Sequence, residues 1–208
     1  YEIRLSLVGS EMCIRDRVAV VYYHIYCDPR SYSNVLALFW GIMCVFWIYD
    51  LIVDYTPFEL NHKHKKLAVL LCFLPLAYPL FSVARGMDFP MMTSPVMPCS
   101  VAVFTIGLLL AFSQRVNLFL ILFLCHWALI GFTKTYFFQI PEDFLLASSA
   151  VPGLYLFFKE YIAANLHTAT HLKARLVNIT LLVVCGAISL LFMISMVCEL
   201  AQDGSLSK

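Results

Sequence analysis

Ionisable side chains that lie within long apolar runs are the first candidates for chemistry in this sequence: His24, Asp50, His126 and Lys134. Such groups are costly in the hydrocarbon region of a bilayer, so each is by default a candidate ligand-binding residue. His126 and Thr133 are seven residues apart and share a helix face, which suits a polar site inside a helical bundle. Hydrogen bonding of the histidines to neighbouring helices is the alternative.

Two of these residues also have a simpler interpretation. Asp50 and Asp54 lie near the end of an apolar run, where pairing with the lysines of segment 63–66 would neutralise them. Lys134 is close enough to the end of its run to extend its ammonium group to the membrane surface.

Cys99 is the best candidate for a reactive thiol. Pro90, Pro95 and Pro98 precede it, and proline is favoured at the first position of a helix. We therefore expect Cys99 near a helix N-terminus, where the helix dipole stabilises a thiolate. The alternative is that the loop and the cysteine only cap and pack a bundle. Other cysteines fall mid-run, without a Cys-x-x-Cys pair, and are expected to be packing residues: Cys44, Cys72, Cys125 and Cys185.

Two histidine pairs make a weaker case for a metal site. His62 and His64 flank Lys63, and His167 and His171 are one helical turn apart. Histidines at this spacing can bind one metal ion. However, neither a carboxylate nor a cysteine completes the pattern of a known metalloenzyme, and the nearby lysines would repel a cation. We therefore expect solvated interface residues, and neither a metal nor another cofactor.

Small residues form a stripe below Cys99. Ser100, Gly107 and Ala111 share one helix face, with Thr105 alongside. Because small side chains let helices approach closely in lipid, this stripe predicts a helix contact rather than a substrate path.

The composition indicates the environment in which these residues must be positioned. Of 208 residues, 62% are hydrophobic and 13% are charged, and the mean hydropathy is +0.83. Ordinary soluble domains are about 45–50% apolar and about 25% charged, so this composition excludes one. A net charge of +1 argues against a nucleic-acid-binding protein. The predicted partners are the lipid bilayer and a small solute.

The apolar runs predict the elements. A membrane-spanning helix needs about 20 apolar residues, and these runs are continuously apolar rather than alternating. We therefore predict an all-α transmembrane bundle of about six to seven spans, the first truncated, with residues 18–200 as one domain and 201–208 as a short polar tail. Pro75, Pro79 and Pro152 should kink their helices. The predicted spans are Val18–Cys27, Asn34–Val53, Leu67–Ala84, Cys99–Ser113, Leu118–Phe138, Phe144–Phe158 and Leu176–Leu200.

Basic residues in the connecting segments predict the orientation. Taken alternately, one side has seven lysines and arginines and the other has three. The positive-inside rule then assigns segments 54–66, 114–117 and 159–175 to the cytoplasm, and 85–98 with the C-terminus to the outside.

The N-terminal segment 1–17 differs from the rest. It has six charged residues, and residues 6–17, SLVGSEMCIRDR, resemble the read-through translation of a sequencing adaptor. We expect this segment to be non-native and exclude it from the functional interpretation. The alternative is a genuine amphipathic segment.

From Tyr22 onward, the sequence resembles a family of small polytopic bacterial membrane proteins catalogued as a domain of unknown function. The resemblance rests on Tyr23-His24, Tyr78-Pro79, Arg85-Gly86 and Pro98–Leu110, and covers residues 20–158. Ser100 stands where the family pattern has a proline after the cysteine. The resemblance implies a multi-helix protein of the bacterial cytoplasmic membrane and supplies no activity.

Three hypotheses for function follow. The first is a non-enzymatic membrane protein that binds or transports a small solute, with His24, His126 and the Cys99 loop nearest the site and Asp50 and Thr133 as further candidate ligand-binding residues. The second is a membrane thiol- or metal-dependent enzyme or redox protein that uses Cys99 or the paired histidines. The third is a structural or assembly subunit. Under the first, His126→Leu abolishes transport; under the second, Cys99→Ser abolishes activity; under the third, neither matters beyond stability.

Overall fold

A computed structural model gives the architecture of the chain. It describes residues 9–10, 13–15, 17–21, 33–53, 56, 63–86, 97–112, 115–137, 143–163 and 172–202. Within these ranges the regular elements are all helices, so the predicted all-α class is confirmed.

The helices follow the predicted apolar runs. In chain order they are α2 (Ser33–Val53), α3 (Lys65–Phe73), the 3-10 helix η2 (Leu74–Leu76), α4 (Ala77–Ala84), α5 (Pro98–Phe112), α6 (Leu118–Phe137), α7 (Asp143–Ser148), α8 (Ala150–Ile162) and α9 (Leu172–Gln202).

Prolines interrupt two of these units, as predicted. Pro75 lies in η2, which separates α3 from α4. Pro152 lacks the N–H that would bond to the carbonyl of residue 148, and the helix breaks at Ser149, between α7 and α8. The backbone N–H and the hydroxyl of Ser149 both donate to the Leu146 carbonyl, at 3.0 and 2.6 Å. The break therefore leaves no buried polar group of Ser149 unsatisfied.

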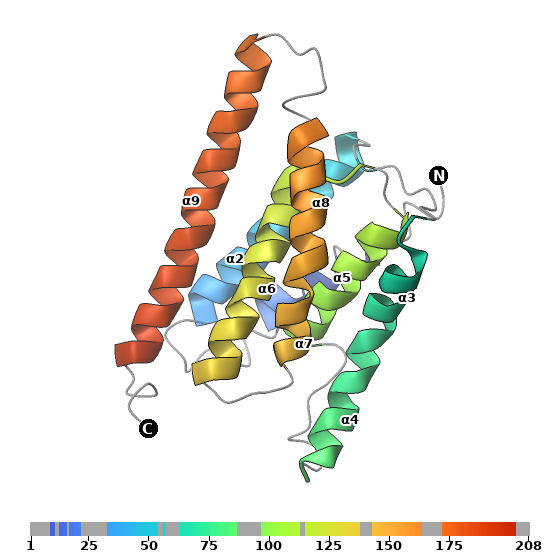
Figure 1. Ribbon diagram of the computed structural model, residues 1–208. Coiled ribbons are helices and arrows are strands. Elements are labelled where there is room, and N and C mark those ends of the chain that lie inside the picture. The colour runs from blue at the N-terminus through green and yellow to red at the C-terminus, as the bar shows by residue number, and fades with distance from the viewer. Residues whose placement is uncertain are drawn as a thin grey trace.

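Successive helical units alternate in direction between two ends of the bundle (Figure 1). The end drawn at the top contains the C-terminal ends of α2, α5 and α8 and the N-terminal ends of α3, α6 and α9. The exposed lysines of segment 63–66 and exposed Arg115 adjoin those ends, as does Lys159. We call this the basic end.

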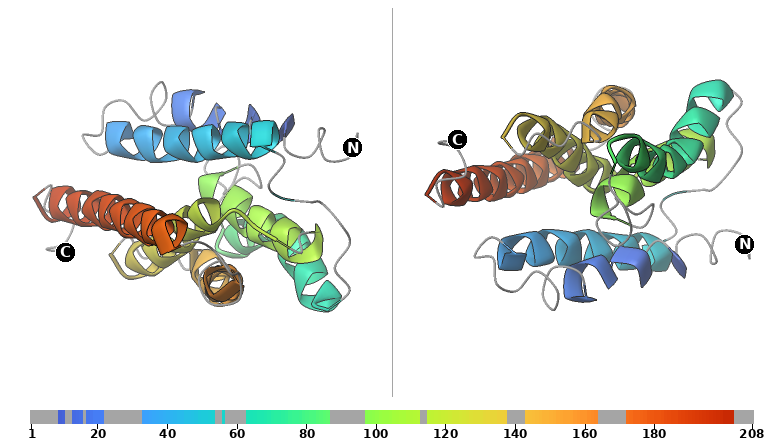
Figure 2. Two further views of the ribbon diagram at one scale, coloured as in Figure 1. Left: turned by 90° about the horizontal axis from the view of Figure 1, so that it is seen from above. Right: turned by 90° about the horizontal axis from the view of Figure 1, so that it is seen from below.

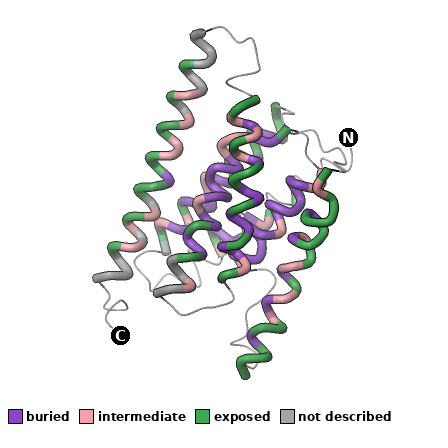
Figure 3. The backbone as a smooth tube through the Cα atoms, in the orientation of Figure 1, coloured by how far each residue is buried: buried purple, intermediate pink, exposed green. Residues whose placement is uncertain are grey.

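Helices α5 and α6 form the core. Twelve of the fifteen residues of α5 are buried, and most of the first half of α6 is buried as well. Figure 3 shows burial concentrated in these two helices, whereas exposed positions predominate on α3, α4 and α9. Helix α2 lies along one side, against α6 and α9 (Figure 2).

Helix α5 crosses α3 at very short range. A Cβ atom added to Gly107 would lie 2.8 Å from Leu71 Cβ and 3.0 Å from the backbone nitrogen of Cys72. Only a residue without a side chain fits there. Gly107 therefore makes the close helix contact that the small-residue stripe predicts.

The outer surface is apolar. Large apolar side chains are exposed on α2, α3, α4, α8 and α9, among them Ile52 (77% exposed), Leu80 (70%) and Val151 (73%). Among the described residues, two helical stretches, Asn34–Val53 and Lys65–Ala84, are long and apolar enough to cross a membrane. Shorter apolar helices are Pro98–Phe112, Leu118–Phe132 and Leu182–Ser195.

Candidate functional site

One face of α2 combines large aromatic side chains with a carboxylate. Trp40, Met43, Trp47 and Asp50 follow one another at spacings of three, four and three, which places them on the same side of a helix. All four side chains are at most 1% exposed. Asp50 is the only charged residue in α2, and this face carries it into the bundle.

Stacked aromatic rings hold this part of α2 against α6. The centres of the Trp40 and Trp127 rings are 5.2 Å apart, edge to face, and those of Phe39 and Phe123 are 5.1 Å apart. Such pairs contribute about 0.5–1.5 kcal/mol each beyond the area that they bury. Phe46 completes the contact by stacking on Phe119 at 5.6 Å, so the rings fix the height and rotation of α2 relative to α6.

A residue that follows the end of α2 forms a hydrogen bond with the Asp50 side chain. The hydroxyl of Thr56, which is itself 2% exposed, donates a hydrogen bond of 2.8 Å to Asp50 Oδ1. A buried carboxylate needs such donors, because the loss of hydration strongly disfavours its charged form. Asp50 is one helical turn from Trp47 and shares its face of α2.

A cation lies over the two indole rings. The guanidinium carbon of Arg15 is 5.0 Å from the centre of the Trp47 ring and 5.9 Å from that of Trp40. The guanidinium also donates a hydrogen bond of 2.9 Å to Thr105 Oγ1. Thr105 in turn donates to the Val101 carbonyl at 2.8 Å, which leaves the lone pairs of its oxygen available to accept.

These groups form what we call the indole site: Trp40, Trp47, Asp50 and Thr105. Indole faces attract cations by at least about 0.5–1 kcal/mol, and more where water is excluded. The hydroxyl and carboxylate oxygens accept hydrogen bonds from a cationic donor. The Nε1–H groups of Trp40 and Trp47 are buried and have no acceptor among the described residues. The site can therefore bind a cation, with two donors left for an acceptor group.

Arg15 belongs to the segment that the sequence predicts to be non-native. The indole site itself lies outside that segment. Its four residues come from α2 and α5, and Arg15 serves here to show which chemical group the two ring faces accommodate.

Of the solute-binding residues predicted from sequence, Asp50 belongs to the indole site and His126 does not. His126 is half-buried on α6, and its Nδ1–H donates to the Leu122 carbonyl of the same helix at 2.8 Å. The side chain of Thr133 and the whole of His24 lie outside the described residues.

Cys99 is the second residue of α5, near the helix N-terminus as predicted. It is buried, at 7% exposure, and packs in the hydrophobic core. Its predicted reactivity is untested, although burial at this depth limits access to the thiol.

The predicted metal ligands are represented by His64 alone. Its Nε2 is 3.2 Å from the Tyr155 hydroxyl, and the two rings pack edge to face at 5.1 Å. His62, His167 and His171 lie outside the described residues. Among the side chains that the structure describes, no group of three or more potential metal ligands comes together.

A second buried carboxylate lies at the basic end. Glu160 of α8 is 6% exposed, and it accepts a hydrogen bond from the Val116 N–H in the turn between α5 and α6. Its carboxylate is 3.4 Å from Lys159 Nζ. Burial raises the pKa of Glu160 above its ordinary value, although Lys159 and Arg115 partly oppose the shift. These contacts tie α8 to the α5–α6 turn and give Glu160 a structural role.

Sequence reasoning missed Trp40 and Trp47. The signal was present, since Trp40, Met43, Trp47 and Asp50 repeat at helical spacing. Because almost the whole run is apolar, the hydrophobic pattern does not single out this face. Thr105 was noticed only as a neighbour of the small-residue stripe.

Comparison with known proteins identifies a family without an assigned activity. A family model described as "Family of unknown function (DUF6064)" matches residues 12–168. No curated protein and no solved structure matches the chain. The match confirms the predicted membership of an uncharacterised family, and it begins within the segment expected to be non-native.

Proposed function

The chain belongs to the DUF6064 family of unknown function, and from the indole site we propose that it is a multi-pass membrane protein that binds a small organic cation. The observation that carries the proposal is the guanidinium group over Trp40 and Trp47, hydrogen-bonded to Thr105. A buried carboxylate, Asp50, lies one turn along the same helix face.

Two observations support placement in a membrane. Exposed apolar side chains cover the outer surface of several helices. This apolar surface is much larger than the isolated apolar patches of soluble monomers. The segments that the positive-inside rule assigns to the cytoplasm adjoin one end of the bundle, because successive units alternate in direction (Figure 1). Both agree with about six spans in a bacterial cytoplasmic membrane.

The short helices are compatible with this placement. Helix α5 has 15 residues and therefore spans about 22 Å, less than the hydrocarbon thickness of about 30 Å. It is also the most buried helix, so other helices and not lipid surround it. A short helix that is enclosed by longer ones does not have to match the bilayer.

Chemical rescue tests the proposal directly. Arg15→Ala in the otherwise complete chain removes the guanidinium and leaves the indole site without its cation. We expect the thermal midpoint in detergent to fall by a few degrees, because a desolvated cation–π contact is worth about 2 kcal/mol. Millimolar guanidinium chloride should restore the midpoint, and sodium chloride at the same ionic strength should not.

Second-site variants in the Arg15→Ala background identify the ligands. Trp47→Phe and Asp50→Asn should each weaken rescue at least severalfold. Asp143→Asn is the matched control, since Asp143 is also a buried carboxylate (5% exposed) but belongs to α7. Equal rescue in all variants, or no rescue in Arg15→Ala, would contradict a cation site and favour the structural-subunit hypothesis.

A further inference from the structure

The outer face of α3 and α4 combines positive charge with a long apolar stripe. Lys66, Val69, Phe73, Leu76 and Leu80 follow at spacings of three and four residues, and all five are exposed. Phe73 and Leu76 are 65% and 56% exposed. The stripe therefore begins at a cation at the basic end and continues as apolar side chains only.

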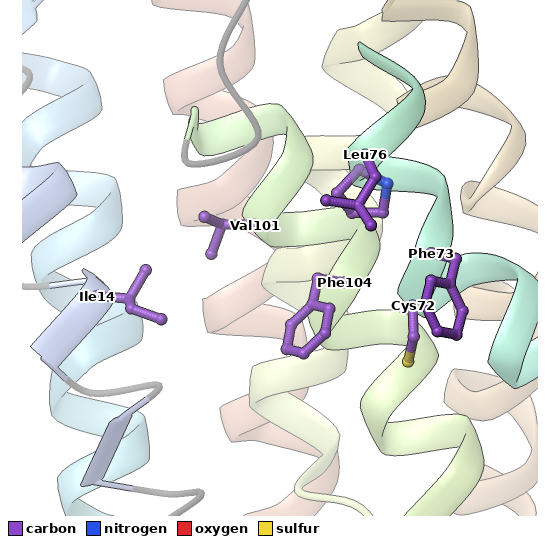
Figure 4. Close-up of a pocket in the computed structure, with 7 residues that line it drawn as sticks. Ile14, Cys72, Phe73, Leu76, Val101 and Phe104 are labelled. Atoms are coloured by element: carbon purple, nitrogen blue, oxygen red, sulfur yellow. The ribbon is translucent and has the colours of Figure 1, made fainter. Parts of the chain in front are cut away.

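A groove opens beside the apolar part of this stripe (Figure 4). It has a volume of about 410 Å³, and the described residues that line it carry no charged side chain. Phe73 and Leu76 form one wall, and Val101 and Phe104 of α5 form the other. The remaining lining residues are Ile14, Cys72 and Pro75.

The groove arises from the way α3 and η2 meet α5. At Gly107 the two backbones are in contact, because glycine leaves no side chain between them. Further along, η2 replaces the α-helix at Pro75, and the facing residues of α5 are the larger Val101 and Phe104. The gap is therefore built by a local change in helix type next to a close crossing.

Charge and depth identify the occupant. Lys65 and Lys66 are exposed in the first turn of α3, which has no acidic residue. At a rise of about 1.5 Å per residue, Leu76 lies about 15 Å further along than Lys66. This distance equals half of the hydrocarbon core of about 30 Å. A lipid whose headgroup lies at Lys66 thus has its chain ends at the level of the groove.

We propose that the α3–α5 groove binds an acyl chain of an anionic phospholipid, with the lipid phosphate at Lys65 and Lys66. The inference rests on the proposed membrane placement but not on the cation site. Lysine at a membrane surface attracts anionic lipid, and the apolar lining suits a hydrocarbon chain.

The test uses the complete chain in phosphatidylcholine vesicles that contain a small fraction of photoactivatable phosphatidylglycerol, with a diazirine near the chain end. Peptide mass spectrometry locates the cross-links. We expect them at 72–76 and 101–104, several times more often than with photoactivatable phosphatidylcholine at the same fraction. Lys65→Ser with Lys66→Ser should reduce the phosphatidylglycerol signal roughly fivefold for each lysine.

Two control variants separate the headgroup from the chain. Arg85→Ser removes an exposed cation at the far end of α4 and should leave the signal unchanged. Phe104→Trp partly fills the groove and should reduce cross-linking at 72–76 even with Lys65 and Lys66 present, while the thermal midpoint confirms that the variant folds.

The outcomes distinguish this proposal from membrane placement itself. Equal cross-linking by the two lipids, or no loss in the double lysine variant, would overturn the anionic-lipid site. Cross-links on exposed apolar positions of α9, such as Val183 and Leu191, but none in the groove would overturn it while supporting a membrane protein. No cross-links on any helix would overturn both.

Discussion

The α3–α5 contact and the α2–α6 contact are built on opposite principles. At the first, Gly107 allows the backbones to touch, and an added Cβ would be 2.8 Å from Leu71 Cβ. At the second, large rings separate the helices, with Trp40 and Trp127 in edge-to-face contact at 5.2 Å. The first contact requires a residue without a side chain, and the second is made by large aromatic side chains.

This difference indicates where function is located. The Gly107 crossing leaves no space for polar groups between the helices. The aromatic contact holds α2 at a distance, and the buried indole N–H groups of Trp40 and Trp47 and the carboxylate of Asp50 lie on that helix. The close crossing at Gly107 therefore supplies rigidity, and the face of α2 carries the groups of the proposed cation site.

Gly107→Ala should break the first contact with the largest effect on stability. The new methyl group would overlap Leu71 Cβ and the Cys72 backbone, which forces the helices apart. Overpacking of this kind costs about 1–3 kcal/mol. We expect a clear drop in the thermal midpoint in detergent, without a change in guanidinium affinity beyond that due to unfolding.

Gly41→Ala is the matched control, since an added Cβ there meets nothing within 4 Å. Alanine is favoured over glycine in a helix by about 1 kcal/mol, so this variant should be as stable as the original or more so. Equal loss of stability in both variants would show that the Gly107 crossing is not close.

His126→Leu tests whether the α2–α6 region also transports its ligand. The His126 Nδ1–H donates to the Leu122 carbonyl of the same helix, so the loss of this hydrogen bond should change stability little. If the solute passes along α6, the variant should take up little labelled guanidinium into proteoliposomes while guanidinium rescue in the Arg15→Ala background persists. Intact uptake would contradict a transport role for His126 and limit the α2–α6 region to binding.

Much of the fold could be predicted from sequence, because it depends on hydrophobic runs. The runs gave the helices from α2 to α9 within a few residues, and Pro75 marked the position where η2 interrupts the third run. The number of membrane spans could not be fixed in this way. Among the described residues, length and hydropathy together distinguish Asn34–Val53 and Lys65–Ala84 as able to cross a membrane.

The site was less predictable because it depends on contacts between helices. Asp50 stands out in the sequence as a carboxylate in an apolar run, and the sequence predicts its pairing with the lysines of the following loop. The hydrogen bond from the Thr56 hydroxyl depends on how the chain continues after α2, which the hydrophobic pattern does not specify. In a uniformly apolar helix, the hydrophobic pattern does not show which face is buried, so Trp40 and Trp47 were indistinguishable from other packing residues.

Glu160→Gln is expected to have the smallest effect. It provides a comparison with Asp50, because Glu160 is a buried carboxylate outside the indole site. Its pKa is raised by burial, so the folded protein keeps this proton to a higher pH than the unfolded chain does. The protonated carboxyl contributes its full stabilisation of the fold below the ordinary glutamate pKa. This contribution is lost as the pH rises through the raised pKa of Glu160. Glutamine cannot ionise but keeps an oxygen that accepts from the Val116 N–H.

We therefore expect the thermal midpoint of Glu160→Gln, relative to the original chain, to increase as the pH rises from acidic to neutral. The difference between the two proteins isolates Glu160, since all other carboxylates titrate in both. Guanidinium rescue in the Arg15→Ala background should be unaffected, in contrast to Asp50→Asn. A midpoint difference that is constant with pH would show that the Glu160 carboxylate is compensated fully by Lys159 and Arg115. Weakened rescue would place Glu160 in the cation site and remove the distinction between Glu160 and Asp50.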